Sequence, residues 1–266
     1  MGEQFAVINQ PAGLGDILYT LKIADKIIRE GATVYWPLIP EYMWLKRHIN
    51  IPKLLFVPTN KLQFPLLDLY NSKCVDPVRG NNFLYLPLKY VLHNPKYAVE
   101  ELPMYSKYIM AGMETSAFSW WDVYKDSLVL FASKALKIFE LRVQSVSYIF
   151  HNKLVGSPDG THLAELEPAF RNNYQLDLPI VYNQIIDGYS MFDWFRVLDS
   201  ATEIHTPDTA LCFIVDILRK NFGFCANTSL FMYPRDLRRA NVPLYLNSCF
   251  QFSSDNPKEW FYVHPS

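Results

Sequence analysis

The first part of the chain alternates between short apolar runs and longer amphipathic stretches. A run of strand-favouring residues at 5–9 leads into a glycine-containing turn at 10–16. Over residues 17–28, apolar positions recur every three or four residues, as on one face of a helix that Gly31 would end. Further strands are predicted at 33–38 and 54–57, and a helix at 40–49. This order is typical of a parallel sheet covered by helices.

The second half of the chain repeats the alternation of strands and helices. Strands are predicted at residues 146–150, 179–182, 201–205 and 230–233, and helices at 192–198 and 206–218. Ser190 is suited to cap the first of these helices. Residues 100–142 carry an apolar stripe at helical spacing, which predicts a helical connection between the halves. After residue 233 we predict a loop-rich tail.

The two halves together predict an α/β protein made of two Rossmann-like domains that face each other across a cleft. We place the first domain at residues 1–140 and the second at 141–266, each close to the commonest domain size. Ligands of such sheets bind at the carboxyl ends of the strands, so the turns that follow strands are the places to look for chemistry. Residues 59–115 contain no recognisable motif, and we expect ligand-binding loops there.

Composition excludes several classes of protein. With 50% hydrophobic and 19% charged residues, the chain can bury a core and is not a disordered one. A formal net charge of -1 argues against binding to nucleic acid through overall charge. The four cysteines form no metal-binding or disulfide pattern. No apolar run is long enough for a transmembrane helix and the N-terminus does not resemble a secretory signal, so we expect a cytoplasmic protein.

The first candidate site is the turn that contains Gly13, Gly15 and Asp16, between a predicted strand and a predicted helix. Small residues there would let a ligand approach the backbone and the first N–H groups of the helix. Asp16 has two interpretations that the pattern leaves open. It may be a carboxylate that stabilises the first helical turn, or a general base in a cleft.

The second candidate site follows the predicted strand at 201–205 and contains His205, Thr206, Asp208 and Thr209. The helix that begins there offers backbone N–H groups to a phosphate, although Thr206 or Asp208 could simply cap it. Two cations, Lys153 and Arg235, follow other predicted strands of this half, and each is either a phosphate counter-charge or a solvent-exposed side chain.

No metal site is predicted. The sequence contains no pair of aspartates two residues apart, and its histidines show no ligand spacing. Any phosphate chemistry should therefore be independent of metal ions and cofactors.

Two motifs resemble those of the heptosyltransferases, which are family 9-like glycosyltransferases of the GT-B fold. Residues 15–21, Gly-Asp-Ile-Leu-Tyr-Thr-Leu, are similar to the N-terminal Gly-Asp-(Val/Ile)-(Leu/Ile)-x-Thr-Leu motif. Residues 208–211, Asp-Thr-Ala-Leu, resemble the C-terminal Asp-Thr-Gly-Leu-x-His motif, with Ala210 in place of its glycine and Phe213 in place of its histidine. The pattern as a whole resembles small GT-B-like proteins from bacterial, phage and large-virus sugar-modification gene sets.

The resemblance implies an inverting, metal-independent transfer of a sugar from a nucleotide-diphosphate sugar to a hydroxyl of a glycan or another acceptor. Asp16 would accept the proton of that hydroxyl. The amides near residues 206–209, the Thr209 hydroxyl and Lys153 would stabilise the departing diphosphate. Asp208 would contact a donor hydroxyl or cap the helix.

Two other functions remain open at this point. One is a catalytically silent GT-B-like protein that binds a glycan or a nucleotide as an assembly partner. The other is a glycosyltransferase that acts on modified DNA bases, against which the lack of positive charge argues mildly. The sequence does not predict the oligomeric state.

Overall fold

The computed structural model describes residues 4–99, 102–131, 147–155, 164–165, 174–234, 249–250 and 259–263. The chain divides into two compact units, one made of Met1–Val129 with Leu244–Cys249 and the other of Leu130–Pro243 with Phe250–Ser266. The predicted boundary at residue 140 lies outside the described residues.

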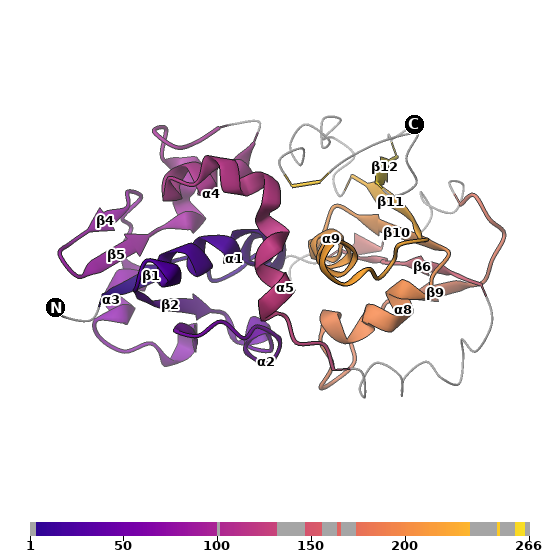
Figure 1. Ribbon diagram of the computed structural model, residues 1–266, viewed down its shortest axis with the longest axis horizontal. Coiled ribbons are helices and arrows are strands. Elements are labelled where there is room, and N and C mark those ends of the chain that lie inside the picture. The colour runs from indigo at the N-terminus through magenta and orange to yellow at the C-terminus, as the bar shows by residue number, and fades with distance from the viewer. Residues whose placement is uncertain are drawn as a thin grey trace. The chain divides into compact units, whose positions relative to one another are not determined.

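The first unit is built on a five-stranded sheet in the order β3-β2-β1-β5-β4 (Figure 1). Its strands are β1 (Phe5–Ile8), β2 (Thr33–Leu38), β3 (Leu54–Pro58), β4 (Val78–Arg79) and β5 (Phe83–Leu86). All pairs are parallel except β4 with β5. The chain winds outward from β1 to β3 and then returns to the other side of β1, so the direction of winding reverses between β1 and β5.

Short and long helices connect these strands or follow the last of them. They are α1 (Leu14–Arg29), η1 (Pro40–Tyr42), α2 (Leu45–His48), η2 (Thr59–Lys61), α3 (Leu66–Asn71), η3 (Leu88–His93), α4 (Pro103–Ala111), η4 (Glu114–Val123) and α5 (Tyr124–Ser127). Because crossover connections are right-handed, the reversal after β3 places α1 and α3 on opposite faces of the sheet. The hydroxyls of Tyr108 and Tyr124 donate to backbone oxygens of α1 at 2.6 and 2.7 Å and so hold α4 and α5 against it.

The helical conformation predicted for residues 100–142 is confirmed over much of their described part, but it is divided among α4, η4 and α5. Gly112 ends α4 in the left-handed region with φ +69°, and Ser119 interrupts η4 with a non-helical backbone. Leu128 then leaves the helical conformation and bridges to Ile49. The apolar stripe is real, since Trp120 and Tyr124 are buried, but several short helices present it to the core instead of one continuous helix. The remainder of this prediction lies outside the described residues.

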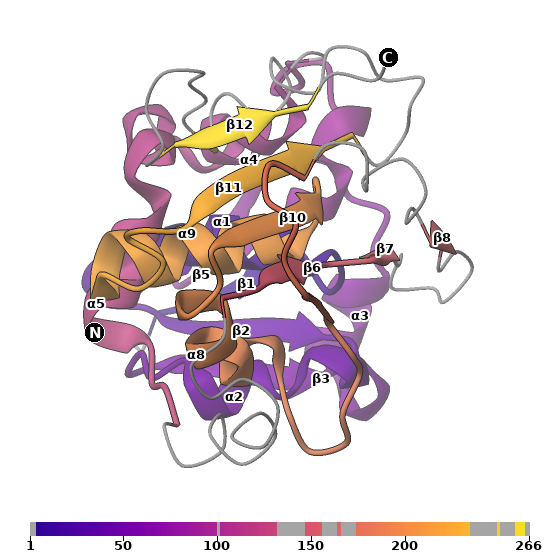
Figure 2. The same cartoon turned by 90° about the vertical axis from the view of Figure 1, so that its right-hand side faces the viewer.

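The second unit contains an all-parallel five-stranded sheet in the order β12-β11-β10-β6-β9. Its strands are β6 (Ile149–His151), β9 (Ile180–Tyr182), β10 (Glu203–Pro207), β11 (Ser229–Tyr233) and β12 (Trp260–Tyr262). Figure 2 shows β12, β11, β10 and β6 running in the same direction. Here the winding reverses between β6 and β10. A separate antiparallel pair is formed by β7 (Leu154–Val155) and β8 (Ala164–Glu165).

Helices η6 (Met191–Trp194), α8 (Phe195–Asp199) and α9 (Ala210–Phe222) belong to this second unit. The predicted cap at Ser190 is confirmed, because its backbone N–H and its hydroxyl donate to Asp193 Oδ2 at 2.7 and 2.9 Å. The prediction of a loop-rich tail is wrong at β12, whose Trp260 is buried and donates its indole N–H to Asp216 of α9 at 2.9 Å. A three-residue strand is too short to show a period in the sequence.

The predicted fold class of two Rossmann-like α/β domains is therefore confirmed unit by unit, since each unit winds in both directions around a mainly parallel sheet. Cys212, Cys225 and Cys249 are buried free thiols. Among the described helices, none is both long and apolar enough to cross a lipid bilayer.

Candidate functional site

Both motifs lie where the winding of their own sheet reverses. In open α/β sheets, the crevice at this point, beyond the carboxyl ends of the two central strands, is the usual place for a ligand. In the first unit the point lies between β1 and β5, and Gly13, Gly15 and Asp16 follow β1. In the second it lies between β6 and β10, and Lys153 follows β6 while Thr206, Asp208 and Thr209 end β10 and begin α9.

An asparagine closes the end of the first central strand in each unit. The backbone N–H of Asn9 donates to Leu86 at 2.8 Å, and its side-chain amide donates to the Tyr85 hydroxyl at 2.8 Å. Asn152 follows β6 in the same way, and its backbone N–H donates to His205 at 2.8 Å. Both side chains are buried. Each asparagine thus joins the two strands between which the winding reverses.

Asp16 is held in place by a buried cation. It lies in the first turn of α1, and its Oδ1 is 2.7 Å from Lys107 Nζ of α4. Lys107 is only 5% exposed, and its ammonium also donates to Gln10 Oε1 at 2.5 Å. A cation so deeply buried requires such partners, because an unpaired buried charge is costly. The Asp16 carboxylate itself stays about one-third exposed, with 35% of its side-chain surface open.

Gly13 is required by the position of Asp16. It precedes α1 in the left-handed region, with φ +79°, and a Cβ added there would lie 2.5 Å from Asp16 Oδ2. Gly13 therefore provides both the backbone turn and the space for the carboxylate. Gly15 is the second residue of α1.

Tyr42 is a further member of this site. Burial raises the pKa of Tyr42, a hydrogen bond from the Leu14 backbone opposes the rise, and the charges of Glu41 and Asp16 add to it. The phenol therefore lies close to the first turn of α1. Neither Tyr42 nor Lys107 was found from the sequence, although a lysine within the largely apolar helix α4 could have been recognised as a buried cation.

In the second unit, Asn152 brings the predicted threonines together. Its side-chain amide donates to Thr206 Oγ1 at 2.9 Å and to Thr209 Oγ1 at 3.0 Å. Asn183 in turn donates to Asn152 Oδ1 at 2.5 Å and fixes the amide in this orientation. Because the Thr209 oxygen accepts a hydrogen bond, its own proton can be donated to a ligand. Asn152 and Asn183 were also missed by the sequence reasoning, which concentrated on charged and hydroxyl side chains.

Thr209 occupies the N-cap position of α9, but its side chain makes no capping hydrogen bond. Thr206 is buried near the end of β10, whereas Asp208 and Thr209, which follow the carboxyl end of this central strand, are half-buried. Neither Thr206 nor Asp208, the two residues proposed as caps, occupies the cap position. Pro207 is the last residue of β10 instead of the first residue of the helix. The half-buried Lys153 places its ammonium 5.1 Å from the centre of the Tyr182 ring.

His205 lies on the face of the sheet, enclosed by other side chains. Its Nε2 is 2.7 Å from Glu203 Oε2 and its Nδ1 is 2.7 Å from the Tyr233 hydroxyl. The ring stacks on Phe231 at a centroid distance of 4.4 Å and contacts Tyr174 at 4.6 Å. Burial lowers the pKa of His205, and the hydrogen bond and charge of Glu203 only partly oppose this. His205 is therefore a buried histidine that joins β10 to β11. Arg235 lies outside the described residues.

Within the described part of the chain, no three His, Cys, Asp or Glu side chains lie close enough together to hold a metal ion. The groups at the two reversal points include the carboxylates of Asp16 and Asp208, two lysines, threonine hydroxyls and asparagine amides. These can accept a proton at one point and donate hydrogen bonds to an anion at the other.

Gly13→Ala should destabilise the protein more than Gly112→Ala. Both glycines have positive φ, so each alanine should cost about 1–2 kcal/mol of unfolding free energy. Only the new methyl at position 13 meets a neighbour, Asp16 Oδ2, which should add about 1–3 kcal/mol. Urea denaturation measures both effects. In the Asp16→Ala background, where the Lys107 pair is already lost, adding Gly13→Ala should cost only the backbone contribution of about 1–2 kcal/mol. Equal losses in the two single variants would contradict the contact.

The enclosed His205 should make stability fall at low pH. The unfolded imidazole gains a proton near its ordinary pKa of about 6.5, whereas burial lowers the pKa in the folded state, so the unfolded chain binds more protons. The free energy of unfolding should therefore decrease as the pH falls below about 6.5, by at most about 1.4 kcal/mol per pH unit from this group. Denaturation of wild type and His205→Gln from about pH 5 to pH 8 tests this, and equal slopes would contradict it.

No protein-family model matches the chain, and no curated protein matches it. Among the solved structures with a similar fold are glycosyltransferases, at low sequence identity. The iron-containing dodecameric glycosyltransferase TibC from enterotoxigenic E. coli H10407 has a TM-score of 0.48 and 12% identity over 88% of this chain and 59% of its own. A glycosyl transferase family 9 protein from Veillonella parvula has a TM-score of 0.46 and 8% identity over 98% and 85% of the two chains.

A second TibC structure, a heptosyltransferase in complex with ADP-D-β-D-heptose, has a TM-score of 0.45 and 13% identity over 82% of this chain and 57% of that one. This chain thus spans less than two thirds of the length of TibC. With TM-scores below 0.5, these are likenesses of fold alone.

Proposed function

We propose that the protein is a metal-independent, inverting glycosyltransferase, which moves a sugar from a nucleoside-diphosphate donor to a hydroxyl of a carbohydrate-type acceptor. The observation that carries the proposal is the position of the two motifs. Each lies at the reversal point of its own parallel sheet, at the first turn of a helix, where ligands of such sheets bind. The resemblance of both motifs to those of the heptosyltransferases supports the same reaction.

On the acceptor side, Asp16 would be the general base. Lys107 and Gln10 hold its position, and its carboxylate remains accessible to an acceptor. Inversion requires a direct attack by the acceptor oxygen on the anomeric carbon. Asp16 would accept the hydroxyl proton as that oxygen–carbon bond forms and the bond from the sugar to the diphosphate breaks.

On the donor side, the first turn of α9 and the Thr209 hydroxyl would bind the diphosphate. The leading N–H groups of a helix have no partner within the helix and favour an anion. Asn152 would position the Thr209 hydroxyl, and Lys153 would supply positive charge as the diphosphate leaves. We propose that Asp208 contacts a donor hydroxyl. The cation and the hydrogen-bond donors would replace a metal ion in this role.

His205 and Arg235 would have different roles. His205 would support the site indirectly, by holding β10 against β11, because its ring nitrogens already bond Glu203 and Tyr233. Arg235 follows β11 in the sequence and remains a candidate phosphate ligand.

A catalytically silent binding protein is the second candidate function, and the Asp16–Lys107 pair is the observation that favours it. An ion pair between α1 and α4 can serve the fold alone, with no part in chemistry. A transferase for modified DNA bases has no comparable support, given the formal net charge of -1.

Asp16→Asn should abolish sugar transfer and leave the fold intact. The donor is first found by thermal shift with a panel of nucleotide sugars, because a ligand of the native state raises its stability. The asparagine oxygen can still accept from Lys107 but takes up no proton, so transfer or hydrolysis of the donor should fall roughly 100-fold or more. The matched control is Asp25→Asn, which breaks the α1 surface pair with Arg29 and should leave the rate unchanged.

Undiminished transfer by Asp16→Asn would remove Asp16 as the base. Binding of a nucleotide sugar without any transfer or hydrolysis in the wild type would favour the silent binding protein. Strong inhibition by EDTA would contradict the metal-independent mechanism.

Asn152→Ala should weaken nucleotide binding. Without the amide, the Thr209 hydroxyl loses the hydrogen bond that orients it, and the dissociation constant for ADP or UDP should rise about five- to tenfold. Isothermal titration calorimetry measures this directly. Asn221→Ala removes an asparagine bonded to the Ile217 backbone near the other end of α9, and should bind as the wild type does. Equal affinity of all three proteins would contradict a diphosphate site at the α9 N-terminus.

A further inference from the structure

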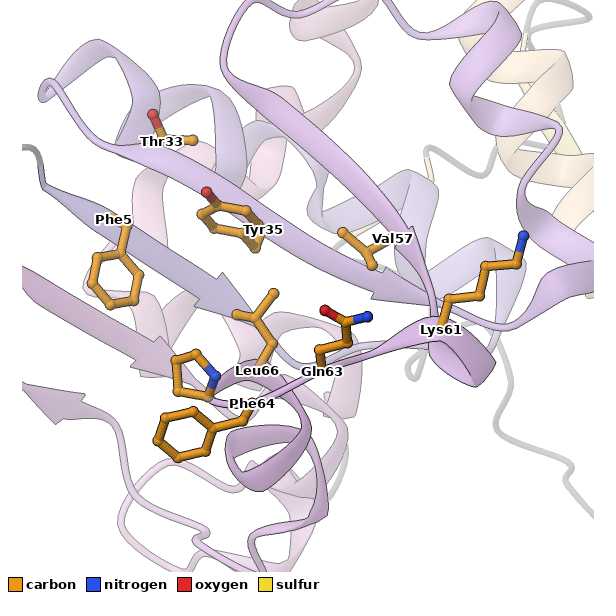
Figure 3. A pocket seen from close by; sticks show the side chains of 9 residues that line it. Phe5, Thr33, Tyr35, Val57, Lys61, Gln63, Phe64 and Leu66 are labelled. Atoms are coloured by element: carbon orange, nitrogen blue, oxygen red, sulfur yellow. The ribbon is translucent and has the colours of Figure 1, made fainter.

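A pocket of about 460 Å³ lies on the first unit, and its lining does not include the residues at the reversal point of that unit (Figure 3). This volume is in the range of small-molecule sites, roughly 300–1,000 Å³. One wall is the face of the sheet, through Phe5, Tyr35 and Val57. The other wall is the segment that leads into α3, through Gln63, Phe64 and Leu66.

The pocket exists because α3 is too short to cover its face of the sheet. On the face that carries Ala6, Val34 and Trp36, these side chains are completely buried. On the opposite face, Phe5 and Tyr35 are only half-buried. Helix α3 has six residues, and the Ser72 hydroxyl just after it contacts the Tyr85 hydroxyl of β5 at 3.4 Å. The surface above β1, β2 and β3 is therefore left partly open.

Aromatic rings make up much of this open surface. Phe5 and Tyr35 meet edge to face with ring centroids 6.4 Å apart. Phe64 is 81% exposed, although a phenylalanine side chain gains most from burial. In Figure 3 the rings of Phe5 and Tyr35 lie across the pocket from Leu66 and from the Phe64 segment. A ligand with apolar C–H surfaces would cover these rings.

Polar groups between the rings favour a ligand that also forms hydrogen bonds. The Tyr35 hydroxyl and the Gln63 amide can each donate and accept hydrogen bonds, as sugar hydroxyls also do. A hydrocarbon chain would cover these groups without bonding to them, which costs free energy. None of the lining residues is acidic, and the ammonium of Lys61 points away from the rings at the rim (Figure 3). A ring with apolar faces and hydroxyl edges matches this lining.

We propose that this pocket binds one sugar residue of the acceptor glycan, at a distance from the hydroxyl that reacts. The identification of that glycan as the acceptor rests on the proposed glycosyltransferase function. The pocket extends to β3, two strands from β1, which corresponds to about 10 Å across the sheet. It also lies on the α3 face, whereas α1 and Asp16 are on the other face. A second contact on the face opposite to Asp16 would select an extended acceptor over a single sugar.

The test is saturation-transfer NMR on the full chain without nucleotide sugar, with the methyl glycosides of glucose, galactose, mannose, rhamnose and N-acetylglucosamine as probes. At least one glycoside should bind the wild type. Phe64→Ala and Gln63→Ala should each weaken that binding about tenfold, the loss of one ring or amide contact. Phe118→Ala removes another strongly exposed phenylalanine of the same unit, 60% exposed on η4, and should bind as the wild type does.

Three results would overturn the proposal: no glycoside binds, binding survives both pocket variants, or octanoate or adenosine occupies the pocket in place of a sugar. The glycosyltransferase proposal is tested separately, because Asp16→Asn and nucleotide binding concern residues outside the pocket. A protein that transfers sugar but binds no glycoside here would refute the pocket alone. Glycoside binding at the pocket by a protein without transferase activity would refute the transferase and leave a sugar-binding protein.

Discussion

The reversal of winding beside the first strand of each sheet is the constraint on which the rest of the structure depends. At this point, the connections that leave the two neighbouring strands run to opposite faces of the sheet. No helix therefore lies directly over the carboxyl ends of these two strands. The backbone and side-chain groups there still need hydrogen bonds. Asn9 and Asn152 provide them, each directly after the first strand and each bonded to the strand beyond the reversal.

The two asparagines meet the same requirement but serve different surroundings. Asn9 donates its side-chain amide to Tyr85 within the core, while its Oδ1 has no hydrogen-bond partner among the described residues. The chemistry of the first unit lies further along the chain, at Asp16. Asn152 donates hydrogen bonds directly to the hydroxyls of Thr206 and Thr209. In the second unit, the asparagine itself therefore holds side chains of the candidate site. The first point presents an anion held by a buried cation, and the second presents hydrogen-bond donors at a helix start. Each point has one carboxylate and one lysine, Asp16 with Lys107 and Asp208 with Lys153, so the two points differ in their hydrogen-bonding groups and not in their formal charge.

Much of the fold follows from local patterns in the sequence. Buried parallel strands appear as continuous apolar runs, and α1 and α9 show clear helical periodicity, so their positions could be predicted. The Ser190 cap follows from the preference of serine for that position. Predictions failed where the pattern was too short or was interrupted. The strand at Trp260 has three residues, and Gly112 divides a stripe that looked continuous.

The candidate site divides in the same way between local and distant residues. The sequence by itself determined that Gly13 and Asp16 begin one helix and that Asp208 and Thr209 precede another, because neighbours in the chain share a turn. It could not determine that Lys107 reaches Asp16, or that Asn152 holds Thr209, since these contacts join residues far apart in the chain. Only the tertiary structure decided the order of the strands, and with it the two reversal points and the face that α3 leaves open. Those features depend on how helices and strands pack against one another, and the hydrophobic periodicity of one helix or strand does not specify which others it contacts.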